Sequence, residues 1–153
     1  MEPVKAPAPL VIISSSPYIH CGSTISAAMR DVLLSLLPAL AAAVYFFGWP
    51  ALSVILTCCL SAVICEALCQ KLMQRPITVG DGSALLTGLL LAFCLPPELS
   101  LGLAAFGSFC AVVIGKQVFG GLGSNIFNPA HLGRAILLLS LIHISEPTRP
   151  EPI

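Results

Sequence analysis

The sequence predicts an all-α protein, a polytopic membrane helix bundle, from three observations. Hydrophobic residues make up 57% of the 153 residues and charged residues only 9%, whereas an ordinary soluble domain is about 25% charged. The apolar residues form long stretches, and Gly and Pro residues separate these stretches. Because a soluble domain of this size keeps much of its surface in water, the lipid bilayer is the solvent that fits. The formal net charge of zero provides no basic field for nucleic acid.

The chain divides into an arm, a partial transmembrane domain and a tail. Residues 1–30 are rich in Pro and Ser and show no helical period, so we expect a cytoplasmic N-terminal arm. Residues 31–140 contain five hydrophobic segments, near 32–49, 51–69, 83–95, 99–118 and 129–140. A helix needs about 20 residues to cross a hydrocarbon core of about 30 Å. Segment 83–95 is too short to cross alone, so a crossing and a re-entrant element both stay open.

The basic residues predict the orientation of the bundle. They precede the first segment, follow the second and close the fourth: Lys5, Arg30, Lys71, Arg75 and Lys116. The turn between the first two segments and the turn between the third and fourth contain neither Lys nor Arg. Since basic loops stay on the cytoplasmic side, we expect the N-terminus in the cytoplasm and a multi-pass chain.

Two segments, 77–91 (ITVGDGSALLTGLLL) and 119–135 (FGGLGSNIFNPAHLGRA), contain the candidate site. Each has a polar, Gly-rich beginning followed by a short apolar helix, as in the broken helices of transporters. Asp81 and Ser83 can cap the first helix, and Asn128 can cap the second with Pro129 at its first position. Two interpretations stay open: these helix starts line a cavity or ion path, or they are capped loops at the cytoplasmic surface. The candidate residues for a cavity or ion path are Asp81, Gly82, Ser83, Thr87, Asn125, Asn128, Arg134 and Glu66.

Glu66 and Arg134 are charged residues within apolar segments. A carboxylate at membrane depth costs several kcal/mol unless it is paired or faces water, which makes Glu66 a candidate functional residue. Its place near the cytoplasmic end, close to Lys71, favours instead a carboxylate that reaches the lipid headgroups. Arg134 could neutralise an acid such as Asp81, bind an anionic group or lie at the surface.

Small residues predict where helices pack. Gly107, Ala111 and Gly115 recur every four residues, and such a face lets another helix backbone approach closely. Gly88 and Ala92 form a weaker pair of the same kind.

No catalytic or metal-binding pattern is visible. The sequence shows no nucleophile–base pair, phosphate loop or carboxylate dyad. Six of its seven cysteines lie in apolar runs without CxxC spacing, so we interpret them as small hydrophobic residues rather than metal ligands.

At the two candidate segments the sequence resembles a known family. PITVGDGSALLTGLLLAFCLPP and IGKQVFGGLGSNIFNPAHLGRAILLLS resemble the D subunit of the Rnf complex and, less closely, the B subunit of the sodium-translocating NADH:quinone reductase. SSSPYIHCGSTISAAMRDVLLSLLPAL and YFFGWPAL are similar too, so the resemblance covers roughly residues 12–140. One departure is Tyr18, which follows Pro17 where family members usually have His.

The resemblance implies a membrane subunit of a complex in the bacterial inner (plasma) membrane, with the other Rnf subunits as partners. As a translocase and oxidoreductase, that complex passes electrons from reduced ferredoxin to NAD⁺ and moves Na⁺ or H⁺. The full subunit resembles two inverted repeats, of which this chain would supply the first half. The family carries covalent FMN on a threonine of a Ser/Thr-Gly-Ala-Thr motif, which is absent here; Thr87 lies in a different motif. We therefore expect this fragment alone to be inactive, and a channel or small-solute transporter of similar fold is the alternative.

The tail, residues 141–153, is expected to be non-native. The string LSLIHISEPTR at 139–149 resembles the translation of a sequencing adapter. Its prolines, Pro147, Pro150 and Pro152, cannot continue a membrane helix.

Overall fold

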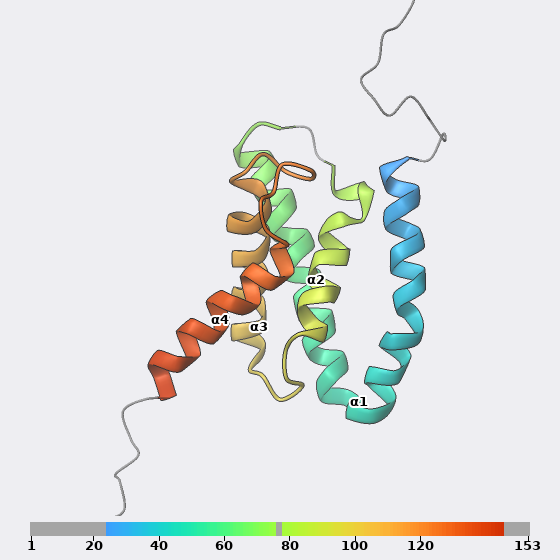
Figure 1. The fold of residues 1–153 in the computed structure, drawn as a ribbon, viewed down its shortest axis with the longest axis vertical. Coiled ribbons are helices and arrows are strands. Elements are labelled where there is room, and N and C mark those ends of the chain that lie inside the picture. The colour runs from blue at the N-terminus through green and yellow to red at the C-terminus, as the bar shows by residue number, and fades with distance from the viewer. Residues whose placement is uncertain (1–23, 76–77, 146–153) are drawn as a thin grey trace, which may run out of the picture.

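The computed structural model describes residues 24–75 and 78–145 of the chain. Its first helix, α1 (Ile25–Leu72), begins at Thr24, whose side-chain oxygen accepts a hydrogen bond from the Ala27 amide at 3.2 Å. The helix thus starts inside the predicted arm, and residues 1–23, including Tyr18, lie outside the described residues. Helix α1 consists of two arms that run in opposite directions and diverge from the turn that joins them (Figure 1).

Gly48 separates the two arms of α1. Its backbone angles, φ 67° and ψ −148°, belong to a region that is essentially restricted to glycine. Pro50 follows near the start of the second arm, where its missing N–H costs nothing. The predicted turn between segments 32–49 and 51–69 is therefore confirmed, and α1 consists of two helices joined at Gly48.

The later segments form shorter helices. In order they are the 3₁₀ turn η1 (Val79–Asp81), α2 (Ser83–Phe93), α3 (Leu101–Val112), the π-helical turn η2 (Val113–Gln117) and α4 (Pro129–Ser145). The described ranges contain helices and no strand, which confirms the all-α prediction. Helix α4 extends to Ser145 rather than to residue 140, so it includes the start of the tail that was expected to be non-native.

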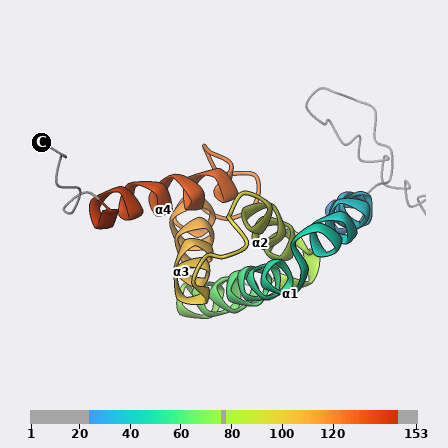
Figure 2. The same ribbon diagram turned by 90° about the horizontal axis from the view of Figure 1, so that it is seen from below.

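Helix α2 lies between α1, α3 and α4 (Figure 2). A Cβ on Gly88 would lie 2.8 Å from the Cys58 carbonyl oxygen, so α1 and α2 approach closely only because this residue is glycine. Ala92 belongs to the same buried cluster as Cys58, which confirms the predicted Gly88–Ala92 packing face.

The two ends of α2 lie at opposite ends of the bundle. Gly82 is next to Leu33, near the start of α1, whereas the loop after α2 reaches the Gly48 turn. The third segment therefore runs from one end of the bundle towards the other.

Helices α3 and α4 pack through small residues. A Cβ on Gly133 of α4 would lie 2.7 Å from the Gly107 carbonyl oxygen and 2.8 Å from the Ala111 Cβ. A Cβ on Gly115 would lie 2.9 Å from the Pro129 Cα. The predicted contact face on 107, 111 and 115 is therefore confirmed, and its partner is α4.

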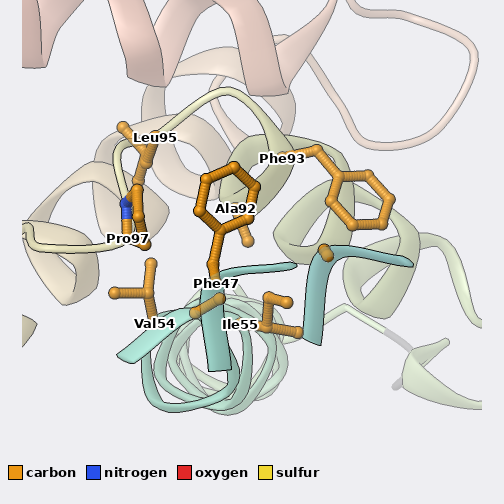
Figure 3. Close-up of a pocket in the computed structure, with 9 residues that line it drawn as sticks. Phe47, Val54, Ile55, Ala92, Phe93, Leu95 and Pro97 are labelled. Atoms are coloured by element: carbon orange, nitrogen blue, oxygen red, sulfur yellow. The ribbon is translucent and has the colours of Figure 1, made fainter. Parts of the chain in front are cut away.

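An apolar pocket of about 150 Å³ lies where α1 turns back. In Figure 3, Phe47 from the first arm and Val54 and Ile55 from the second arm face the end of α2 and the loop after it. The lining contains no titratable side chain. Next to this pocket, the Tyr45, Phe46 and Trp49 side chains are exposed; aromatic side chains of this kind are enriched at membrane–water interfaces. Within the described ranges, α1 has the length and apolar composition to cross a membrane.

Candidate functional site: a buried ion pair between two broken segments

Glu66 and Lys116 form a buried ion pair in the interior of the bundle. The Lys116 Nζ lies 2.6 Å from the Glu66 Oε1. Glu66 has a relative exposure of 0% and Lys116 of 2%. Glu66 comes from the second arm of α1, and Lys116 comes from η2, 50 residues later in the chain. Charged side chains are almost never buried this completely unless they are paired, and here each charge neutralises the other.

The π-helical turn places Lys116 at this position. In η2 the Val118 amide donates to the Val113 carbonyl at 3.0 Å, one residue further back than in an α-helix. This wider turn buries two consecutive side chains, Lys116 and Gln117, and both donate to the Glu66 Oε1; the Gln117 Nε2 lies 3.2 Å from it. Single π-helical turns are frequent at functional sites.

Gln70 completes the donors around the carboxylate. Its Nε2 donates to the Glu66 Oε1 at 3.1 Å and to the Thr78 Oγ1 at 2.9 Å. Its side-chain oxygen accepts from the Thr78 amide at 2.9 Å, which fixes the orientation of the Gln70 amide. The Glu66 Oε1 therefore accepts three hydrogen bonds, whereas the buried Glu66 Oε2 has no partner among the described residues.

The ion pair is also hydrogen-bonded to the first of the two Gly-rich segments, 77–91. Lys116 Nζ also donates to the Ser83 Oγ at 2.6 Å. The Ser83 hydroxyl in turn donates to the Asp81 Oδ1 at 2.5 Å, and the Ser83 amide donates to the same oxygen at 2.8 Å. The result is a hydrogen-bonded series of polar groups (carboxylate, ammonium, hydroxyl and carboxylate) that connects α1, η2, α2 and η1.

Two cavities meet at this hydrogen-bonded series of polar groups. The larger, of about 400 Å³, has polar lining from both broken segments and from the ion pair: Ser83, Thr87, Lys116, Asn125 and Asn128. The smaller, of about 280 Å³, has its polar lining from the Glu66 side: Glu66, Gln70, Arg75, Thr78, Asp81 and Gln117. Leu122 lines both cavities. The Glu66–Lys116 pair and Leu122 therefore lie at the boundary between them.

Seven of the eight predicted candidates lie at these two cavities or beside them. Asp81 accepts from the Ser83 amide, as predicted for a cap, whereas Ser83 is the first residue of α2 and its hydroxyl binds Lys116 and Asp81 instead of capping the helix. Asn128 caps α4 by accepting from the Ala130 amide at 3.0 Å, as predicted. Thr87 donates to the Ser83 carbonyl at 2.9 Å.

Gly82 and Asn125 have local structural roles. Gly82 precedes α2 with φ 78° and lies against Leu33 of α1. Asn125 donates to the Phe127 carbonyl at 3.0 Å.

The expectation that Glu66 reaches the headgroups is wrong, because this side chain is fully buried and paired. Of the three alternatives for Arg134, an ion pair with Asp81 is not formed among the described residues. Arg134 instead lines a separate cavity beside Pro96.

Lys116 is the site residue that the sequence interpretation missed. Its position near the end of an apolar segment suggested a residue that only orients the bundle, yet it is buried. A signal was available, because segments 51–69 and 99–118 each contain a single charged residue, and the two charges are opposite. Opposite charges in neighbouring membrane segments are natural partners, since a lone buried charge is costly.

Comparison with known proteins identifies a family and several similar proteins. Residues 12–144 match the NQR2, RnfD, RnfE family. The chain is 51% identical over 128 residues to the D subunit of the proton-translocating ferredoxin:NAD(+) oxidoreductase complex of Clostridium ljungdahlii. It is 48% identical to the D subunit of the Na(+)-translocating ferredoxin:NAD(+) oxidoreductase complex of Acetobacterium woodii, and 47% identical to the D subunit of the ion-translocating oxidoreductase complex of Escherichia coli. Each alignment covers 84% of this chain but only 39%, 40% and 37% of the respective relative.

Proposed function

The chain belongs to the NQR2, RnfD, RnfE family, and from this premise we propose that it acts in a D subunit of an ion-translocating electron-transport complex. The complex transfers electrons from reduced ferredoxin to NAD⁺ and uses the free energy to move Na⁺ or H⁺ across the membrane. The names of two relatives, one proton-translocating and one Na⁺-translocating, support this reaction. The chain spans about two fifths of those relatives, so the complete reaction needs further polypeptide and the other subunits of the complex.

The buried Glu66–Lys116 pair is the observation that carries the proposal for this chain. Removing two charges from water costs several kcal/mol per ion, and well-packed apolar residues often stabilise a fold as well or better. Stability alone therefore gives little reason for the pair, whereas an ion path needs a charge that an arriving cation can neutralise. Cavities on the two sides of the pair give such a cation two routes of approach.

We place the chain in the inner (plasma) membrane as a multi-pass protein with its N-terminus in the cytoplasm. Arg30 lies near the start of α1 and Lys71 and Arg75 lie near its end, whereas Tyr45 and Trp49 lie at the turn between its two arms. The positive-inside rule then assigns the basic end to the cytoplasm. Attaching a reporter enzyme after residue 49 or residue 75 tests this, and we expect only the second fusion to be active in the cytoplasm.

We propose no flavin site on this chain. The family resemblance implies covalent FMN on a Ser/Thr-Gly-Ala-Thr motif, and none of the 153 residues belongs to such a motif. Thr87 does not replace it, because its hydroxyl is buried and donates to the Ser83 carbonyl. No electron-transfer step is therefore assigned to these residues, whose proposed role is in ion movement.

Nothing in the part of the chain that the structure describes favours a passive channel or solute transporter instead. The named relatives belong to oxidoreductase complexes, and the ion pair lies across the boundary between the two cavities.

The test uses membrane vesicles from the host organism with the gene intact, deleted or restored. We expect oxidation of reduced ferredoxin by NAD⁺, with accompanying ion uptake, to disappear on deletion and to return on complementation. The 153-residue chain alone should restore neither activity. Unchanged NAD⁺ reduction and ion uptake in deletion vesicles would contradict the proposal.

A further inference from the structure

We propose that Arg134 and the apolar cavity beside it form a docking surface for a further membrane helix of the same polypeptide, and that this helix supplies a carboxylate to Arg134. The surface is built by α4, the end of α2 and the loop between α2 and α3. It shares no lining residue with the two cavities at the Glu66–Lys116 pair. Its role is in assembly and does not depend on ion movement.

Arg134 is a charged side chain without an ionic partner among the described residues. It is partly buried on α4, in an apolar segment that contains no acid. An arginine side chain keeps its charge in proteins, and a charge within a membrane span is rare unless it is paired or faces water. Arg134 therefore needs a counter-charge.

The acids of the described ranges do not supply this counter-charge. Glu66 is already paired on the far side of α2, and Asp81 lines the cavity beside it. Asp31 is exposed on the first arm of α1, and Glu98 is exposed in the loop before α3. Neither forms an ion pair with Arg134. The carboxylate has to come from outside the described residues.

The cavity beside Arg134 is apolar and has a volume of about 440 Å³. Phe93 and Leu95 line it from the end of α2 and the following loop, and Leu137 and Leu138 line it from α4. Arg134 is the only charged residue among those that line it. The surface thus fits an apolar helix, and the single positive charge selects a helix that carries one acid.

The depth of Arg134 favours a protein carboxylate over a lipid headgroup. Its neighbour Gly133 packs against Gly107 and Ala111, which lie in the middle of segment 99–118. Basic side chains near helix ends reach the headgroups, whereas a charge inside a span pairs with other protein groups or faces a water-filled cavity. The occupant therefore carries its Asp or Glu within an apolar segment.

The relatives have enough further polypeptide to supply this helix. The alignments cover only 39% and 40% of the two ferredoxin:NAD(+) oxidoreductase subunits, so more than half of each lies outside them. Figures 1 and 2 show that the far end of α4 extends past the other helices. A further helix can therefore approach the cavity from outside the bundle.

Photo-crosslinking in the full-length subunit, assembled into the complex in its host, tests the proposal. A benzophenone amino acid replaces Leu138, which is exposed at the cavity, and mass spectrometry identifies the crosslinked peptide. We expect a peptide from the part of the same subunit outside the aligned region, with an Asp or Glu inside an apolar segment. The same amino acid at Leu60, exposed on α1, is the control and should not crosslink to this peptide.

Charge exchange tests the role of Arg134 itself. Arg134→Glu should lower the amount of assembled complex by roughly tenfold or more, because like charges then meet at this contact. Replacing the acid of the crosslinked helix by Arg should restore assembly in the Arg134→Glu subunit. Arg134→Lys, which keeps the charge, should retain most of the complex.

Two results would overturn the proposal. One is crosslinking of position 138 only to lipid or to another subunit. The other is restoration of the Arg134→Glu subunit by Glu98→Arg, because the partner would then be the exposed loop acid of this chain. The crosslink leaves Arg134 intact, so its result stands even if a charge variant fails to fold. Failure of the proposed function would show in the vesicle assay and would leave the crosslink unchanged.

Discussion

Removing one charge of the Glu66–Lys116 pair should destabilise the chain far more than removing both. At 2.6 Å and an effective dielectric constant of about 20, two unit charges attract by about 6 kcal/mol. Part of this is offset by desolvation, so we expect Glu66→Gln or Lys116→Met alone to cost about 3–5 kcal/mol of unfolding free energy. The double variant leaves no buried charge at this contact. It should be within about 1–2 kcal/mol of the wild type, since replacement of a buried pair is often nearly neutral.

Buried thiols provide the assay. Cys58 and Cys110 are buried in the bundle, so a maleimide dye should label them only after unfolding. In detergent, with the other cysteines replaced by alanine, the labelling rate against temperature gives the relative stability of the four proteins. The double-mutant cycle isolates the coupling between the two residues. Additive losses, with the double variant the least stable protein, would refute the conclusion that the two charges depend on each other.

Three further substitutions test the fold by the same labelling assay. Gly133→Ala should lower the free energy of unfolding by about 1–3 kcal/mol because the new Cβ overlaps α3. Gly102→Ala is the control, because open space surrounds this glycine. Equal stability of the two variants would contradict the close contact between α3 and α4. Gly48→Ala should cost about 1–3 kcal/mol through backbone strain at φ 67°, whereas Gly80→Ala should be tolerated; a stable Gly48 variant would argue against the turn. Asn128→Ala should cost about 1 kcal/mol through loss of the α4 cap, and Asn128→Asp should recover most of it; no recovery would exclude capping as the cause.

Periodicity and turn chemistry predicted most of the fold. The Gly48–Pro50 turn, the small-residue face of α3 and the Asn128 cap each depend on neighbouring residues or on one helix face, and these properties can be read from sequence. The boundaries were less certain because α1 begins at Ile25 inside a Pro- and Ser-rich region and α4 continues to Ser145.

The site was only partly predictable, because its central contact joins residues 50 positions apart. Sequence reasoning identified Asp81, Ser83 and Asn128 from their places at helix starts. It placed Glu66 at the headgroups because the depth of a side chain depends on how helices pack. It also missed Lys116, because the opposite charges of segments 51–69 and 99–118 were not considered as a pair and the π-helical turn that buries this side chain has no sequence signature of its own.

The number of ions moved per electron tests the central claim most directly. Vesicles containing Glu66→Gln, Glu98→Gln or the wild-type complex are supplied with reduced ferredoxin and NAD⁺, and electron transfer and ion uptake are measured together. We predict that Glu66→Gln lowers ion uptake per electron at least tenfold while NAD⁺ reduction continues in the presence of an ionophore, and that Glu98→Gln matches the wild type. A wild-type ratio in the Glu66→Gln vesicles would contradict a role of the buried pair in ion movement.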